Sequence, residues 1–178
     1  MSDRITLTEV PIAAAWNVQG DASRTGFTDQ VAGQFSLALP AVPNTTARGD
    51  ALMAFWLGPR SWLLVAESTG LPLADFVKKR DAMNAAGGAL FDLTASRVAY
   101  RLAGSRATDA LATGCPLDLH PRAFRAGDCA QSLFGRVNAL LYKSDDAPTF
   151  LIMVARSFAR DVWQTLCFCS AQYGYQEA

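Results

Sequence analysis

One series of elements occurs twice along this chain of 178 residues. Apolar residues alternate with their neighbours over residues 12–18, which predicts a strand with one strongly apolar face, and Gly20 ends it. A helix, a hairpin and a second helix are expected to follow. Residues 98–103 alternate in the same way, and Gly104 leads into another helix. We therefore predict a single compact unit made of two related halves, residues 1–95 and 96–178.

The strand, helix, strand, strand, helix, strand order of the first half is expected at residues 12–18, 27–39, 52–57, 61–66, 71–86 and 89–94. The second half is expected to place its elements at residues 98–103, 106–113, 130–134, 137–142, 149–154 and from 157 onward. This order is typical of a split βαβ arrangement, in which helices cover one face of an antiparallel sheet. The predicted fold class is α+β, with two tandem βαββαβ-like halves.

Side-chain directions follow from the helical spacing. In the helix over 71–86, Leu73, Phe76 and Val77 are predicted to point inward, and Ser105 is the expected N-cap of the helix over 106–113. In the last helix the predicted buried stripe is Phe158, Val162, Leu166, Cys169 and Tyr173.

Charge and apolar runs limit the classes of partner. Acidic and basic residues balance at 16 each, and no basic cluster stands out, which argues against a nucleic-acid binder. The first residues lack the apolar core of a signal peptide, and no apolar run reaches the ~20 residues that span a bilayer. We expect a cytoplasmic protein whose four cysteines are reduced and mostly buried.

The chain has few residues of the kinds that form catalytic or metal sites. A single histidine, His120, excludes a two-histidine metal site, and the cysteines lack zinc-site spacing. The glycines do not form a phosphate-binding loop, and Asp145 with Asp146 has the composition of a hairpin turn. We therefore predict no catalytic, cofactor-binding or metal-binding residue on this chain.

One loop does not look ordinary, because two prolines restrain its backbone and two leucines need an apolar environment. Its residues are Cys115, Pro116, Leu117, Asp118, Leu119, His120 and Pro121. Either the loop packs on its own domain and connects a helix to a strand, or it docks into a partner. The composition leaves both alternatives open, and we take these seven residues as interface candidates.

The same loop carries a family resemblance. The sequence GCPLDLHPRAF at residues 114–124, with CAQSL at 129–133 and RSFA at 156–159, resembles the gamma-subunit family of heterotetrameric sarcosine oxidase. WLGPRSWLL at 56–64 and DLTASR at 92–97 also fit that family. The similarity spans nearly the whole chain, and the motif at 114–124 is its most specific part.

The resemblance implies a non-catalytic accessory subunit of an oxidoreductase. In that family the chain assembles with alpha, beta and delta subunits into an enzyme that demethylates sarcosine oxidatively. Glycine and hydrogen peroxide are formed, and the one-carbon unit passes to tetrahydrofolate. The resemblance places FAD, FMN, NAD, tetrahydrofolate and zinc on the partner subunits rather than on this chain.

The family is also distantly similar to the T-protein of glycine cleavage, a folate-dependent aminomethyltransferase. Two departures weaken an enzymatic role. Ala95 stands where those relatives commonly carry histidine, and the Gly-Gly-apolar-Asp-Asp segment that supplies their catalytic carboxylate has no match near residues 135–142.

Two alternatives remain beside the accessory role. The chain could be a stand-alone, aminomethyltransferase-like folate-binding module or an enzyme in its own right, with Arg97, Tyr100 and Arg101 as contacts. It could also be the equivalent subunit of a related N-methylglutamate dehydrogenase.

Overall fold

The computed structural model of the protein describes residues 4–66 and 75–178. By its internal contacts the chain divides into two compact units. We call Ile12–Ala95 the inserted unit, and Met1–Pro11 together with Ser96–Ala178 the terminal unit. No helix in the described ranges is long and apolar enough to cross a membrane.

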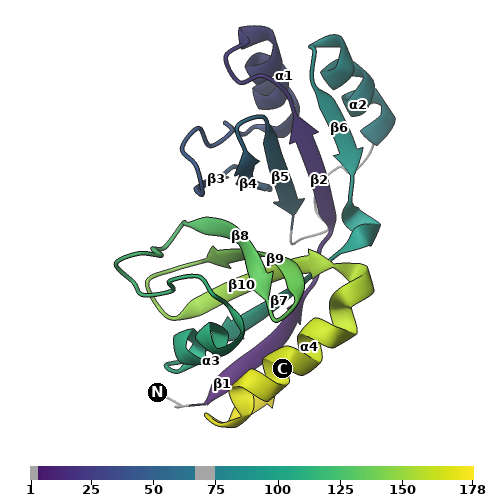
Figure 1. Ribbon diagram of the computed structural model, residues 1–178. Coiled ribbons are helices and arrows are strands. Elements are labelled where there is room, and N and C mark those ends of the chain that lie inside the picture. The colour runs from purple at the N-terminus through teal and green to yellow at the C-terminus, as the bar shows by residue number, and fades with distance from the viewer. Residues whose placement is uncertain (1–3, 67–74) are drawn as a thin grey trace. The chain divides into compact units, whose positions relative to one another are not determined.

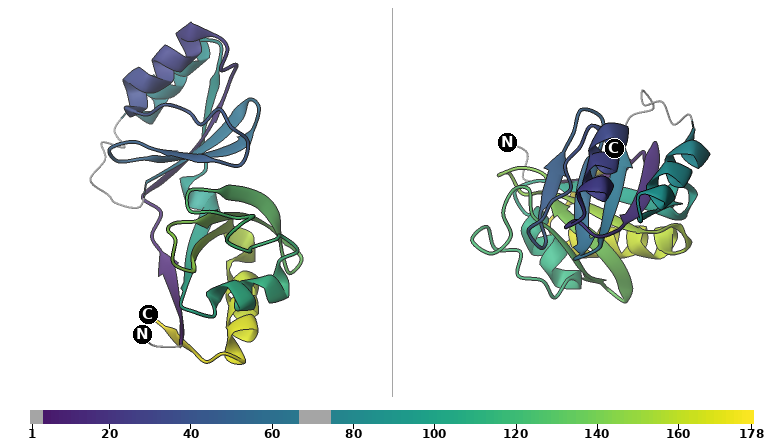
Figure 2. Two further views of the ribbon diagram at one scale, coloured as in Figure 1. Left: turned by 90° about the vertical axis from the view of Figure 1, so that its left-hand side faces the viewer. Right: turned by 90° about the horizontal axis from the view of Figure 1, so that it is seen from above.

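The inserted unit is a five-stranded antiparallel sheet with two helices on one face (Figures 1 and 2). Its elements in chain order are β2 (Ala14–Gln19), α1 (Thr25–Phe35), β3 (Thr46–Arg48), β4 (Met53–Gly58), β5 (Ser61–Ala66), α2 (Phe76–Ala85) and β6 (Ala89–Asp92). The strand order across the sheet is β3-β4-β5-β2-β6. This order follows from the predicted hairpin, β4 with β5, joining the predicted first strand, β2.

Aromatic side chains fill the space beneath these helices. The ring of Trp16 lies 5.7 Å from that of Phe35 on α1 and 6.1 Å from that of Phe76 at the start of α2. Phe27 is fully buried, and its ring reaches the backbone at Gly88, where an added Cβ would lie 2.6 Å from Phe27 Cε2 and 2.8 Å from the Gln19 carbonyl oxygen. Gly88 is therefore required by close packing.

The terminal unit is a six-stranded sheet with helices α3 and α4 on one face. Its elements are β1 (Ile5–Val10), β7 (Arg97–Ala103), α3 (Ala107–Gly114), β8 (Cys129–Phe134), β9 (Val137–Lys143), β10 (Thr149–Ala155), α4 (Ala159–Ala171) and β11 (Tyr175–Glu177). Short 3₁₀ turns, Thr94–Ser96 and Arg156–Phe158, precede β7 and α4. The strand order is β11-β1-β7-β10-β9-β8, antiparallel except for β1 with β11.

The two sheets share one strand order. β3-β4-β5-β2-β6 in the inserted unit corresponds to β8-β9-β10-β7-β1 in the terminal unit, and a helix follows the equivalent strands β2 and β7, and β5 and β10. The difference lies in the position next to the first strand of each repeat. In the inserted unit this position, beside β2, is taken by β6, which follows α2. In the terminal unit the position beside β7 is taken by β1, which precedes the inserted unit in the chain, and β11 pairs with the other edge of β1.

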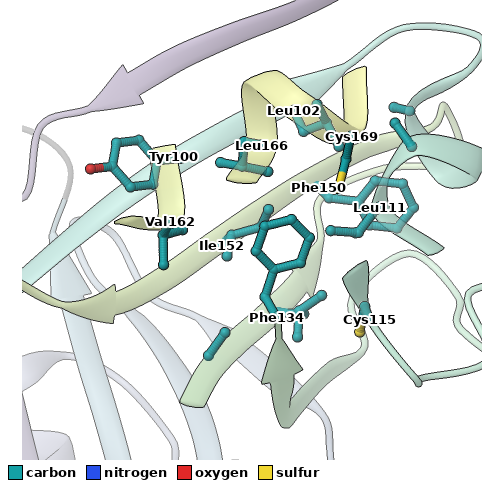
Figure 3. Packing of buried hydrophobic residues seen from close by; sticks show 14 of the residues in the cluster. Tyr100, Leu102, Leu111, Cys115, Phe134, Phe150, Ile152, Val162, Leu166 and Cys169 are labelled. Carbon is teal, nitrogen blue, oxygen red and sulfur yellow. The ribbon is translucent and has the colours of Figure 1, made fainter. Parts of the chain in front are cut away.

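The core of the terminal unit lies between its sheet and its helices, as Figure 3 shows. Leu111 of α3 and Val162 and Leu166 of α4 pack on strand residues such as Phe150 and Ile152. Every one of these side chains is 1% exposed or less. Because Phe150 and Ile152 alternate along β10, they share the helix-covered face.

The predicted α+β class with antiparallel, helix-covered sheets is confirmed, and several details differ. Val77 is 58% exposed and Phe158 is 48% exposed, so neither points inward as predicted. Leu73 lies outside the described residues. Arg106, not Ser105, is the N-cap of α3. Residues before Ile12 were predicted within the first half, but they belong to the terminal unit because β1 pairs with β7.

Candidate functional site

The loop between α3 and β8 contains all seven interface candidates. It begins at Cys115, whose extended backbone ends α3. The Gly135 amide donates to the Gly114 carbonyl over 2.7 Å and ties the helix end to the turn between β8 and β9. The loop is thus attached at its start to the sheet of its own unit.

The leucines of this loop pack inside the terminal unit. Leu119 is 3% exposed and belongs to the core cluster, as do Cys115 and Phe124. Leu117 is half-buried and packs against the same cluster. Figure 3 shows Cys115 at the margin of that cluster. The apolar side chains therefore serve the fold of the chain itself, as the first of the two alternatives requires.

Hydrogen bonds hold the polar part of the loop in two consecutive turns. The His120 amide donates to Asp118 Oδ1 over 3.0 Å, and the Arg122 amide donates to His120 Nδ1 over 3.2 Å. The His120 carbonyl accepts from the amides of Ala123 and Phe124. Since Nδ1 of His120 accepts, the neutral ring carries its proton on Nε2, which is free to face outward.

The exposed residues of the loop are Pro116, Asp118, His120 and Pro121. Two are prolines and two are held by the turn bonds just described, so this face has little conformational freedom to lose on binding. Of the seven candidates, these four form the surface available to a partner. We call them the loop face.

The three residues considered for folate do not converge. Tyr100 is 3% exposed on the helix-covered face of β7, where its hydroxyl donates to the Ala159 carbonyl over 2.9 Å. Arg97 and Arg101 are displaced from Tyr100 by odd numbers of residues along the strand, so their side chains point to the opposite face. One ligand cannot contact all three from one side of the sheet.

Metal and thiol chemistry find little support in the described ranges, 4–66 and 75–178. There no three His, Cys, Asp or Glu side chains are grouped to hold a metal ion. All four cysteines are free, and burial raises the pKa of the Cys167 and Cys169 thiols. A raised pKa keeps these thiols protonated and weakly nucleophilic at neutral pH.

Two hollows were not predicted from the sequence. One, of about 500 Å³, lies in the terminal unit and is lined by residues that include Glu9, Tyr100, Ala159, Arg160, Trp163 and Glu177. The other, of about 200 Å³, lies in the inserted unit beside Trp16 and Gln34. Nothing in the alternation of β1 or the stripe of α4 indicates that charged residues far apart in sequence meet at one groove.

A sequence model of the sarcosine oxidase gamma subunit family matches residues 19–172. The chain belongs to the sarcosine oxidase gamma subunit family.

Two curated relatives carry the name sarcosine oxidase subunit gamma. The protein from Corynebacterium sp. (strain P-1) is 27% identical over 143 residues, which are 80% of this chain and 64% of that protein. The protein from Arthrobacter sp. is 27% identical over 150 residues, 83% of this chain and 71% of its relative. The match thus spans less than two thirds of the first relative's length.

Two solved structures share the fold of this chain. One is a chain of the heterotetrameric sarcosine oxidase from Corynebacterium sp. U-96, in complex with pyrrole 2-carboxylate. It is 25% identical to this chain, and the two superpose with a TM-score of 0.83 over 100% of this chain and 90% of the other. The other is aminomethyltransferase T of the glycine cleavage system from Bartonella henselae. It is 15% identical, and the superposition, with a TM-score of 0.69, includes 98% of this chain and 48% of the transferase. This is a likeness of fold alone. Both predicted resemblances are confirmed.

Proposed function

We propose that this chain is the non-catalytic gamma subunit of a cytoplasmic heterotetrameric sarcosine oxidase. The observation that carries the proposal is the superposition of the whole chain on a chain of such an enzyme, at a TM-score of 0.83. The family match over residues 19–172 supports it at the level of sequence.

In this proposal the alpha, beta and delta subunits carry out the chemistry. They hold FAD, FMN, NAD, tetrahydrofolate and zinc, oxidise sarcosine to glycine and hydrogen peroxide, and transfer the one-carbon unit to tetrahydrofolate. The divergent directions of Tyr100 and the two arginines on β7 support the assignment of folate to another subunit. The gamma chain contributes a folded surface on which larger subunits assemble.

The loop face is the part of the seven-residue interface prediction that we retain. Leu117 and Leu119 are already used inside the terminal unit, so an aspartate at either position would disturb folding before it could report on assembly. Pro116 and Pro121 are exposed, and replacing them removes no backbone donor. They are therefore the better positions at which to test docking.

The first experiment is co-purification of the tagged chain from its native source under growth on sarcosine, with absorbance scanned for flavin. A yellow complex containing larger chains supports the proposal. A colourless chain that purifies alone contradicts it, and titration with tetrahydrofolate would then test the stand-alone module. Turnover of N-methylglutamate in place of sarcosine by the yellow complex would identify the related dehydrogenase instead.

The loop face is tested with the double variant Pro116→Arg/Pro121→Arg. The matched control is Pro43→Arg, which places the same bulky cation at an exposed proline of the inserted unit. We expect the double variant to lose co-purification with the flavin-containing chains, while its melting temperature falls by only a few degrees, since each restraining proline that is lost costs about 0.4–1 kcal/mol. Undiminished assembly of the double variant would exclude the loop face from the interface.

A further inference from the structure

The larger groove is part of neither the loop face nor any site assigned above. It lies in the terminal unit, between the first turns of α4 and the ends of β1 and β11, and its volume is about 500 Å³. Volumes from roughly 300 to 1,000 Å³ are typical of small-molecule sites. The groove is lined by side chains of β1, β7, α4 and β11. Its acidic residues belong to the strands, and its basic residue belongs to the helix.

The strand side of the groove is negative. Glu9 follows Ile5 and Leu7 on the helix-covered face of β1, and Glu177 is the register partner of Leu7 on β11. Glu9 and Glu177 therefore lie on adjacent strands, two residues apart in register, and both line the groove. Two carboxylates on one side of a groove favour a cation beside them.

The helix side of the groove is positive. Arg160 lies in the first turn of α4 and lines the groove together with Glu9 and Glu177. Within the described ranges Arg160 and Glu9 form no ion pair with each other or with any other residue, so no Arg160 nitrogen lies within 4.0 Å of a carboxylate oxygen. The Cys167 thiol of α4 donates to Glu177 Oε1 over 3.9 Å. Opposite charges thus face one groove without neutralising each other.

An aromatic wall completes the groove. Trp163 is half-buried, and its ring centroid lies 5.2 Å from that of Tyr100. The Tyr100 hydroxyl is already donated to the Ala159 carbonyl, so the wall offers aromatic surface rather than a donor. Glu9 and Tyr100 line the same groove; burial first, and then the charge of Glu9, raise the pKa of Tyr100, while Arg156 opposes the shift.

We propose that this groove binds a small zwitterionic amine, an amino acid in free form. Its ammonium group lies between Glu9 and Glu177, where an aromatic face also favours a cation. Its carboxylate pairs with the Arg160 guanidinium, a geometry in which two parallel hydrogen bonds form. A simple cation would leave Arg160 unpaired, and a simple anion would be repelled by two carboxylates. Only a ligand with both charges satisfies all three residues.

The test uses the full chain, with binding measured by titration calorimetry and by tryptophan fluorescence. The probes are glycine and N,N,N-trimethylglycine, with methylammonium and acetate as ligands that carry one charge only. We expect each zwitterion to bind at least tenfold more tightly than either single-charge probe. Glu9→Gln and Arg160→Gln should each weaken zwitterion binding tenfold or more, and Arg136→Gln, an exposed arginine outside the groove, should leave it unchanged.

Trp163→Phe locates the signal, because the fluorescence change should disappear while the calorimetric heat persists. Heat that is absent for both zwitterions up to a Kd of about 10 mM, roughly −3 kcal/mol of binding, overturns the proposal. Equal binding of methylammonium and glycine, or full binding by Arg160→Gln, overturns it as well. These measurements need no partner subunit, so their outcome is independent of the proposed assembly.

Discussion

Replacing Leu119 by alanine separates folding from docking at the loop between α3 and β8. Leu119 is 3% exposed and packs in the core of the terminal unit. Truncation of a buried leucine removes its transfer free energy and leaves a cavity, so the free energy of unfolding should fall by about 3 kcal/mol, within the ~2–5 kcal/mol range for such changes. For a chain of this size that corresponds to a drop in melting temperature of roughly 6–12 °C.

The matched control is Leu133→Ala, at a leucine of the same unit that is 44% exposed on β8. Because this side chain is partly exposed to water and its truncation leaves no buried cavity, the free energy of unfolding should fall by only about 1 kcal/mol. Urea unfolding followed by circular dichroism measures both variants on the isolated chain. If the two truncations cost the same, Leu119 is not a core residue, and the interpretation of the loop as self-packed fails.

Two further predictions concern packing and pH. Gly88→Ala should lower the free energy of unfolding by about 1–3 kcal/mol, because the new Cβ would meet Phe27 and the Gln19 carbonyl; thermal unfolding measures this, and a neutral effect would mean that α1 and β6 can separate at little cost. The raised pKa of Tyr100 means that the neutral phenol is favoured in the folded chain. Its contribution is fully present below the unfolded pKa of about 10 and is lost as pH rises from there through the folded pKa. Tyr100→Phe should therefore flatten the alkaline fall in stability, and an unchanged profile would contradict this.

Local patterns predicted the elements whose partners are near in sequence. The hairpin of β4 and β5 and the hairpin of β9 and β10 follow from short breakers between apolar runs, and β2 and β7 follow from strict alternation. The strands β3 and β11 were missed because each has three residues and little apolar signal. The strand β1 was also missed. Ile5 and Leu7 alternate with polar residues, but β1 pairs with β7, which follows the whole inserted unit in the chain.

Side-chain roles were harder to predict than elements. Helical spacing placed Val162, Leu166 and Cys169 in the core, yet it failed for Val77 and Phe158, which lie near the starts of helices where the phase of the buried stripe is poorly defined. Composition showed that Leu117 and Leu119 needed an apolar environment and could not show that their own unit supplies it. The groove beside α4 was missed for the same reason, since Glu9, Arg160 and Glu177 meet only in three dimensions.

The strand order of the terminal unit also sets the timing of folding during synthesis. β1 leaves the ribosome before the inserted unit, but β7, its pairing partner, emerges only after the whole of that unit. At about 5–20 residues per second this delay is on the order of ten seconds. During that time the inserted unit has its complete sheet and can fold, while Ile5 and Leu7, fully buried at the end, remain exposed to chaperones and to other nascent chains. Closure of the terminal sheet is therefore the late and slow event, and β1 is paired long after it is made.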